Sequence, residues 1–219
     1  IQELVSVFDI NPDEYRAFKK TLKTMEKEGL IFRTKKDKFA LPERLGLITG
    51  KLQAHAKGFG FLIPEIEGEK DVFIPSSFIN GAMNGDRILV QITREDKNGK
   101  KREGEVIQIL ERANTKIIGV YEDSKNFGFV IAEDTRISQD IFISKKDRNG
   151  AKDGDVVVVE ITKWPEKRRS PEGVVKEVLG QKGDKGLDIL TIIKKYGLPE
   201  EFPPKVQAFA SGIDEEIPD

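Results

Sequence analysis

Cysteine is absent from the 219 residues, and histidine occurs once, as His55. The first absence excludes a disulfide framework and any thiolate site, and the second leaves no group of histidines for a zinc centre. No apolar run approaches the roughly 20 residues of a membrane-spanning helix. No signal peptide is visible at Ile1, which resembles a cut edge of a longer chain. We therefore expect a cytoplasmic protein without a membrane partner.

Motifs for small-molecule chemistry are also missing. Gly58 and Gly60 do not form a dinucleotide fingerprint, because a third glycine and a following helix are lacking. No phosphate loop, nucleophile–base pair or convincing carboxylate cluster stands out, and the acidic residues from Asp214 to Asp219 look like a solvated chain end. The sequence thus indicates no small-molecule substrate, no catalytic residue, no metal site and no cofactor in this chain.

The overall charge is close to neutral, with 37 Lys and Arg against 38 Asp and Glu. Nucleic-acid-binding proteins are usually basic, which argues mildly against that class. However, the acidic excess lies in residues 185–219, which hold 4 basic and 7 acidic residues. Local basic clusters elsewhere remain compatible with binding to phosphates.

An internal repeat organises the middle of the chain. Most matching positions are 69 residues apart, whereas the Phe-Gly-Phe motifs are 68 apart, so each copy carries one compensating slip. The matches are Gly50 with Gly119, Phe73 with Phe142, Gly85-Asp86 with Gly154-Asp155, and Phe59-Gly60-Phe61 with Phe127-Gly128-Phe129. The repeat predicts two similar small domains, at residues 46–113 and 114–183.

Each copy has short Val-, Ile- and Phe-rich runs separated by Gly, Asn and Asp, which is typical of β-strands. In the first copy the predicted strands are Lys51–Ala54, Gly58–Ile63, Asp71–Ile74, Arg87–Thr93 and Glu105–Leu110. Five strands in so short a domain favour a closed barrel, which leaves no exposed sheet edge. The predicted fold class is mainly β, with two tandem five-stranded barrels of the OB type.

Strand alternation assigns faces to the aromatic residues. If Leu62, Val72 and Ile74 fill the barrel, then Phe59, Phe61 and Phe73 point outward on adjacent strands. The alternatives are an inverted register, with the rings in the core, or rings covered by a neighbouring domain. Gly60 favours the outward arrangement, because a glycine between two phenylalanines leaves the inward side nearly empty. The second copy repeats the pattern at Phe127, Phe129 and Phe142.

Outward aromatic rings predict a platform on which unpaired bases stack, at about 1–3 kcal/mol per base. We expect His55 and Lys57 beside the first platform, and Lys125 beside the second, to contact the RNA. Basic clusters recur between the last two strands of each copy, where they form either solvated turns or phosphate contacts. They contain Lys97, Lys100, Lys101 and Arg102 in the first copy, and Lys163, Lys167, Arg168 and Arg169 in the second.

Residues 1–45 predict helices followed by a hairpin. Asn11-Pro12 is typical of a helix start and Gly29 of a helix end. A helix with a basic stripe and a basic hairpin tip resembles a winged-helix domain that lacks its first helix. The stripe is either a solvated face or a contact with nucleic-acid backbone.

Residues 184–219 predict a helix at Leu187–Tyr196 and a second, short helix that ends at Ala210. These segments have no core of their own in the sequence. We expect them to lead into a further domain that this chain lacks.

Lys57-Gly58-Phe59-Gly60-Phe61-Leu62 and Asp71-Val72-Phe73-Ile74 resemble the two ribonucleoprotein motifs of the cold-shock domain. The order of the parts, with the tail from Leu179-Gly180 to Phe202-Pro203, resembles the N-terminal half of the bacterial ribonuclease R family. That resemblance implies a processive, hydrolytic 3′-to-5′ exoribonuclease whose Mg²⁺ site lies in a catalytic domain absent here. It also implies single-stranded or structured RNA, and the parent's own catalytic domain, as partners.

Two other functional classes stay open at this point. One is a stand-alone RNA chaperone built from cold-shock modules, and the other is a winged-helix DNA-binding regulator. A further possibility is that the barrels only support a missing domain and bury their rings against it.

Overall fold

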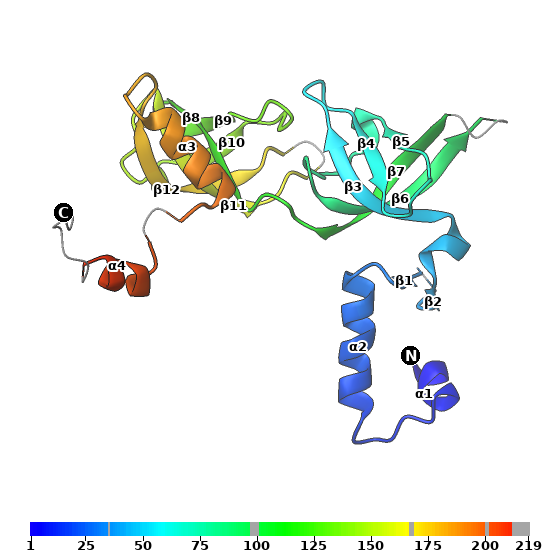
Figure 1. Ribbon diagram of the computed structural model, residues 1–219. Coiled ribbons are helices and arrows are strands. Elements are labelled where there is room, and N and C mark those ends of the chain that lie inside the picture. Colours follow the sequence, from blue (N-terminus) through cyan, green and yellow to red (C-terminus); the bar gives the residue numbers. More distant parts are fainter. Residues whose placement is uncertain (35, 97–100, 167–168, 200–201, 212–219) are drawn as a thin grey trace, which may run out of the picture.

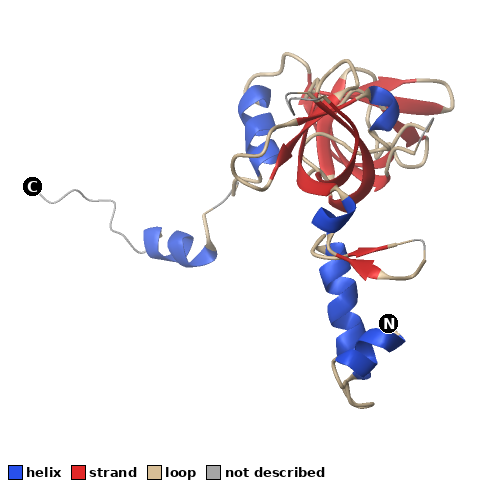
Figure 2. Cartoon of the chain, turned by 90° about the vertical axis from the view of Figure 1, so that its right-hand side faces the viewer, coloured by secondary structure: helices blue, strands red, loops and turns tan. Residues whose placement is uncertain are grey.

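The computed structural model describes residues 1–34, 36–96, 101–166, 169–199 and 202–211. Its centre consists of two β-barrels side by side, with a helical N-terminal part projecting from the first and a helical tail from the second (Figure 1). Figure 2 shows these two projections leaving the barrels in different directions. Among the described residues, no helix has the length and apolar character needed to cross a membrane.

The first barrel closes in the strand order β3-β4-β5-β7-β6. Its core contains Leu52, Leu62, Val72, Ile74 and Val90, each at most 1% exposed. Its strands are β3 (Leu47–Ala54), β4 (Gly60–Pro64), β5 (Val72–Ile74), β6 (Arg87–Glu95) and β7 (Arg102–Glu111), with a short 3-10 helix, η2 (Ser76–Phe78), after β5. The five predicted strands are confirmed, and tertiary pairing extends β3, β6 and β7 beyond their predicted ends.

The second barrel closes in the order β10-β12-β11-β8-β9, which is the same circuit. Its strands are β8 (Lys116–Asp123), β9 (Phe127–Ala132), β10 (Ile141–Ser144), β11 (Asp155–Lys163) and β12 (Glu172–Gln181). The core includes Tyr121, Val130, Ile141 and Val157, each at most 1% exposed. The repeat in the sequence is therefore a repeat of one barrel.

The one-residue difference in spacing between the two copies of the repeat arises in a turn. In the first barrel the β3–β4 turn is closed by a bond from the His55 amide to the Phe59 carbonyl oxygen, 2.8 Å away. In the second barrel the matching bond joins Ser124 to Phe127, also at 2.8 Å, across a turn one residue shorter. The strands stay in register because the loop between β9 and β10 is one residue longer than the loop between β4 and β5.

The N-terminal part packs on the outside of the first barrel. It contains α1 (Gln2–Val7), α2 (Tyr15–Lys27), a hairpin of β1 (Phe32–Arg33) and β2 (Phe39–Ala40), and a 3-10 helix, η1 (Pro42–Leu45). Phe32 and Leu45 cover the outward-facing Leu47, Leu89 and Leu110. The helix and the hairpin form, whereas the winged-helix assignment stays a prediction.

The predicted start of α2 at Asn11 is wrong by one turn. The helix begins at Tyr15, and its N-cap is Glu14. The Asn11 side-chain amide instead donates to Oε2 of Glu14 at 3.2 Å, within a turn that precedes the helix. The Asn–Pro pair thus forms the approach to the helix rather than its first turn.

The helical tail corrects another expectation. We predicted that α3 (Leu187–Tyr196) would have no packing partner, but it lies against β8 and β12 of the second barrel. Leu187 and Thr191 are buried there, and the Lys194 ammonium lies 2.8 Å from Oε2 of Glu177. The second barrel therefore includes α3 in its packing. By contrast, α4 (Pro204–Ala210) is solvent-exposed, with Phe209 at 75% exposure.

Candidate nucleic-acid interface

The first aromatic platform lies on β4, β5 and the turn before β4. Phe61 pairs directly with Phe73 across the two strands, and their ring centroids are 5.5 Å apart. Phe59 lies 6.0 Å from Phe61 and 5.6 Å from Phe73. Phe61 is 38% exposed and the other two rings are half-buried, while Leu62 and Val72 are completely buried. The three rings point outward, as predicted.

Gly60 allows this arrangement for a reason that differs from the one expected. Its inward side is not empty, because the Leu52 side chain of the neighbouring strand occupies the space. A Cβ at Gly60 would lie 2.8 Å from Cδ1 of Leu52, closer than ordinary contact allows. The glycine thus lets the two strands approach while both flanking rings stay on the outer face.

His55 extends the aromatic cluster on the side of Phe59. Its imidazole stacks on the Phe59 ring at a centroid distance of 4.4 Å and an interplanar angle of 8°. The Lys57 amide lies 3.2 Å from Nδ1 of His55, so that the turn fixes the ring. The Lys57 side chain is exposed beside it. The sequence placed both residues near the platform, but the stacked pair depends on the turn geometry.

The second platform has the same construction. Phe127 lies 5.4 Å from Phe129 and 5.7 Å from Phe142, with Phe127 37% exposed. A Cβ at Gly128 would lie 2.4 Å from the buried Tyr121 ring, which fills the inward space. Burial raises the pKa of Tyr121, and the hydroxyl donates to Oδ1 of Asp123 at 2.9 Å, which raises the pKa further.

The charges around the second platform are mixed. Lys125 is exposed in the turn before Phe127, as predicted, but Glu122 and Asp123 are exposed on the strand that leads into it. The Arg148 guanidinium lies 3.8 Å from Asp123 and partly balances that carboxylate. The electrostatic field here is therefore less favourable for a polyanion than a basic surface would be.

The described members of the two predicted basic clusters have different surroundings. Lys101 is exposed and lines a hollow with Phe61 and Phe73. Arg102 is held by the carboxylates of Glu69 at 3.3 Å and Glu95 at 3.0 Å, which compensate its charge. Lys163 pairs with Glu172. Arg169 is exposed and lines a groove that reaches residues of the first barrel. Lys97, Lys100, Lys167 and Arg168 lie outside the described residues.

The junction of the two barrels contains a cluster that the sequence did not reveal. The Arg112 guanidinium donates to Oδ2 of the buried Asp86 at 2.9 Å and stacks over the Trp164 ring, 4.2 Å from its centroid. It also donates to the Gly81 carbonyl oxygen at 2.8 Å. Burial lowers the pKa of Arg112, while the charge of Asp86 raises it. The single tryptophan and the repeated Gly-Asp pair were the available signals, but they do not specify this contact.

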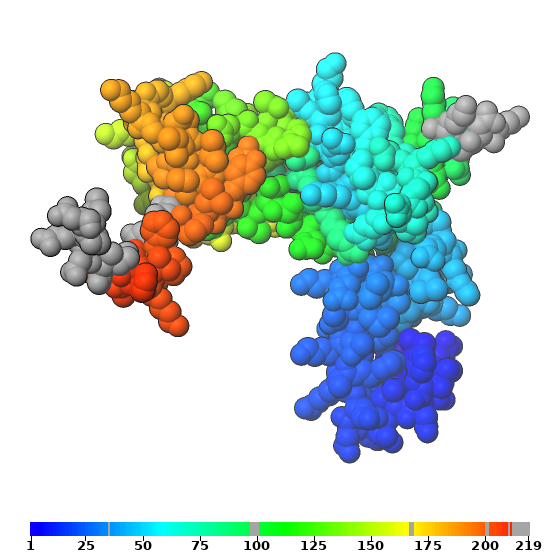
Figure 3. All heavy atoms as spheres, viewed as in Figure 1, coloured from blue at the N-terminus to red at the C-terminus, as the bar shows by residue number. Residues whose placement is uncertain are grey.

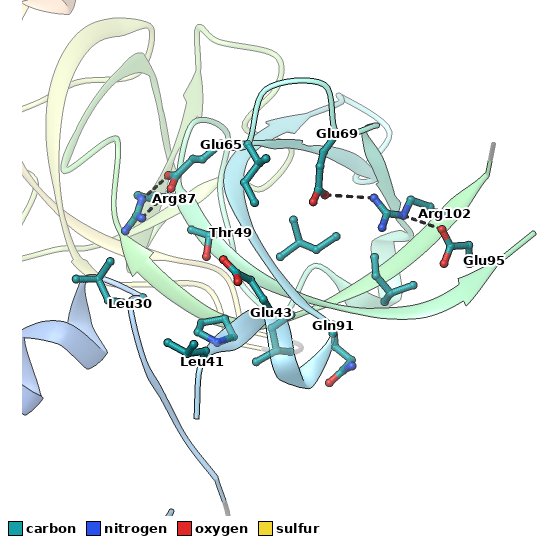
Figure 4. A pocket seen from close by; sticks show the side chains of 17 residues that line it. Leu30, Leu41, Glu43, Thr49, Glu65, Glu69, Arg87, Gln91, Glu95 and Arg102 are labelled. Atoms are coloured by element: carbon teal, nitrogen blue, oxygen red, sulfur yellow. Dashed lines mark hydrogen bonds and ion pairs between the residues drawn. The ribbon is translucent and has the colours of Figure 1, made fainter. Parts of the chain in front are cut away.

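A groove of about 490 Å³ between the N-terminal part and the first barrel has a different chemistry (Figure 4). Its lining includes four carboxylates, and its two arginines, Arg87 and Arg102, are both paired with them. The Arg87 side chain lowers the pKa of Glu65 through a hydrogen bond and its charge. A polyanion would be repelled here, which distinguishes this groove from the aromatic platforms.

No three His, Asp or Glu side chains in the part of the chain that the structure describes lie together in a way that could hold a metal ion. The chemistry that the two platforms offer is non-covalent, through stacking and phosphate contact.

Family models match both barrels. A ribonuclease B OB domain matches residues 50–109, and a cold shock domain matches residues 129–203. Ribonuclease R of Acidithiobacillus ferrooxidans is 32% identical over 100% of this chain and 50% of its own length. Ribonuclease R of Vibrio cholerae is 34% identical over 94% of this chain and 25% of its own length. The chain thus spans half or less of these relatives.

Solved structures show the same fold. The apo form of ribonuclease R from Mycoplasma genitalium superimposes with a TM-score of 0.66 at 20% identity. The match covers 77% of this chain and 27% of that one. A complex of the same Mycoplasma enzyme with ribose-methylated single-stranded RNA matches equally well.

Proposed function

Because this chain belongs to the ribonuclease R family, we propose that it is the N-terminal, single-stranded RNA-binding part of a processive 3′-to-5′ exoribonuclease. The two barrels hold the RNA by stacking bases on their outward rings and by contacting its phosphates. The solved Mycoplasma relative carries single-stranded RNA in one of its complexes, which supports the same ligand for this chain.

The observation that carries the proposal is the first platform. Three phenylalanine rings and a stacked histidine lie on one outer face of a barrel whose core is complete without them. Full burial of such a ring is worth roughly 1.5–3 kcal/mol, and each of these partly exposed rings forgoes a fraction of that free energy. Flat, unpaired bases recover part of that free energy by covering the rings.

Lys57 and Lys101 supply positive charge beside the same rings, and we assign them to phosphate contacts. His55 presents its ring for stacking. Phe127, Phe129, Phe142 and Lys125 form a weaker site, because carboxylates lie close to them.

The hydrolytic activity belongs to the parent protein. The family implies Mg²⁺ held by clustered aspartates in a domain that this chain does not contain, and we propose that the chain delivers RNA to that domain in the cytoplasm. Because ribonuclease R relatives are 32% and 34% identical over 100% and 94% of this chain, the nuclease is favoured over a stand-alone chaperone.

The test is the double variant Phe59→Ala/Phe61→Ala, titrated against a fluorescent, unstructured RNA. We expect an affinity loss of about tenfold or more, since each stacked base contributes about 1–3 kcal/mol and tenfold corresponds to 1.4 kcal/mol. Phe127→Ala/Phe129→Ala is expected to lose less.

Phe78→Ala is the matched control, because Phe78 is 36% exposed on the same barrel and lies outside the platform. Its affinity is expected to equal that of the unaltered chain. If the double variant also binds normally, stacking on the first barrel is refuted.

A further inference from the structure

A small cavity of about 150 Å³ lies where the two barrels meet. The first barrel contributes the β3–β4 turn and the segment after β5, and the second contributes the loop between β9 and β10. That loop extends from the second barrel toward the first in Figure 1, and Figure 3 shows the barrels in contact at this place. The position of a Cβ on Gly58 lies 4.0 Å from Oγ of Ser138, so the loop reaches the turn of the first platform.

The cavity is adjacent to both aromatic platforms. On one side its lining includes His55, whose ring stacks on Phe59. On the other side it includes Gln139, which lies three residues before Phe142 in the chain. An extended chain advances about 3.3 Å per residue, so Gln139 lies within roughly 10 Å of Phe142 along the backbone.

The lining combines an apolar floor with polar groups at the mouth. Ala82 and Met83 are buried below, while the exposed Ser76, Ser138 and Gln139 stand at the rim. Hydroxyl and amide groups both donate and accept hydrogen bonds, so they suit the edge of any base. The Arg136 guanidinium at the rim is already paired with Asp134, at 2.8 and 2.9 Å, which makes a phosphate the poorer occupant.

Its size limits the occupant to one chemical group. Pockets for whole small molecules measure about 300–1,000 Å³, so this cavity is too small for a complete nucleotide. A flat base fits the combination of size, apolar floor and polar rim, while its sugar and phosphate stay outside.

We propose that the cavity takes one nucleobase, turned out of the stack, from an RNA strand whose flanking bases lie on the two platforms. The inference rests on the proposed function and adds the route that the RNA strand takes across the two barrels. The strand passes from Phe61 and Phe73, past Phe59 and His55, across the junction to Phe142. Simultaneous occupation of both platforms strengthens binding, because the second contact becomes intramolecular.

The experiment uses RNAs of about 16 nucleotides, enough for the site size of an OB barrel, with 2-aminopurine placed at successive positions. This base is dim when stacked and bright when unstacked. We expect one bright position flanked by dim ones. Ser138→Leu fills the mouth of the cavity from an exposed loop, and it is expected to abolish the bright position and weaken binding about tenfold.

Thr135→Leu is the control, because Thr135 is exposed in the same loop and does not line the cavity. It is expected to leave both the fluorescence and the affinity unchanged. An RNA of about 4 nucleotides, which reaches one platform, should bind Ser138→Leu normally.

The outcomes separate the two proposals. If the long RNA binds through the rings but shows no bright position, or if Ser138→Leu changes nothing, the cavity is not a base site and the proposed function stands. If Phe59→Ala/Phe61→Ala is also without effect, both proposals are refuted.

Discussion

Asp86 and Asp155 occupy equivalent positions in the two repeats, yet their surroundings differ. Each accepts a bond at 2.8 Å from the backbone amide three residues earlier, which closes the turn before the fourth strand of its barrel. Asp86 additionally accepts from the Arg112 guanidinium and from the Ala113 amide, both at 2.9 Å. Asp155 thus closes a turn, whereas Asp86 closes a turn and also anchors the junction of the two barrels.

This difference predicts unequal effects on stability. Asp86→Ala leaves Arg112 without its carboxylate partner and is expected to lower the free energy of unfolding by about 3–5 kcal/mol, as for other broken buried ion pairs. Asp155→Ala loses a backbone hydrogen bond, with an expected cost of about 1–3 kcal/mol. Urea unfolding followed by circular dichroism measures both. Equal losses would contradict the anchoring role of Asp86.

At the scale of elements, Arg87 on β6 ties three segments together. Its guanidinium donates to Oε2 of Glu65, just after β4, at 2.9 Å and to the Glu28 carbonyl oxygen, just after α2, at 2.7 Å. The end of α2 is therefore attached to the barrel by a polar contact, while Phe32 of the hairpin and Leu45 of η1 supply apolar contacts nearby.

The pair of Arg87 and Glu65 predicts a pH-dependent contribution to stability. The hydrogen bond from Arg87 holds the pKa of Glu65 below its ordinary value of 4.5. The carboxylate therefore stabilises the fold above about pH 4.5, and this contribution is lost as the pH falls through the lower, folded-state pKa. Because Glu65 is partly exposed, we expect less than about 1 kcal/mol.

The measurement compares Glu65→Gln with the unaltered chain from pH 7 to pH 3. The difference in unfolding free energy should be present at pH 7 and should shrink toward zero at the acidic end. Glu67→Gln, at an exposed neighbouring position, is the control and should show a much smaller dependence. A difference that grows on acidification would show that the pair does not act in this way.

At the scale of the whole molecule, the contact between Arg112 and Trp164 joins the two barrels, while α4 extends from the second (Figure 1). The proposed binding surfaces lie on both barrels, whereas the described residues hold no carboxylate cluster for a metal. Binding and hydrolysis are therefore expected to be separable.

We accordingly predict that this chain binds RNA without degrading it. With 3′-end-labelled single-stranded RNA and Mg²⁺, a band shift is expected and no labelled mononucleotide should appear. The parent enzyme, carrying its catalytic domain, is the positive control. Mononucleotide release by this chain alone would refute the assignment of the chemistry to another domain.

The sequence by itself determined the two barrels and the direction of their rings. Hydrophobic alternation fixes the outward side of Phe61 once Leu62 is inside, and the repeat carries the same constraint to Phe129. These features depend on neighbours in the same strand or on a pattern that occurs twice in the sequence. For that reason they could be predicted without coordinates.

Tertiary structure alone decided what lies between the elements. Three contacts illustrate this: the Arg112 junction, the packing of α3, and the approach of Ser138 to the β3–β4 turn. Each joins residues that are far apart in the sequence and that no repeat or periodic pattern relates. The inward space at Gly60 and Gly128 likewise depends on which side chain of the neighbouring strand enters it. Local pattern specifies the face on which a residue lies, whereas its contacts depend on how distant segments pack.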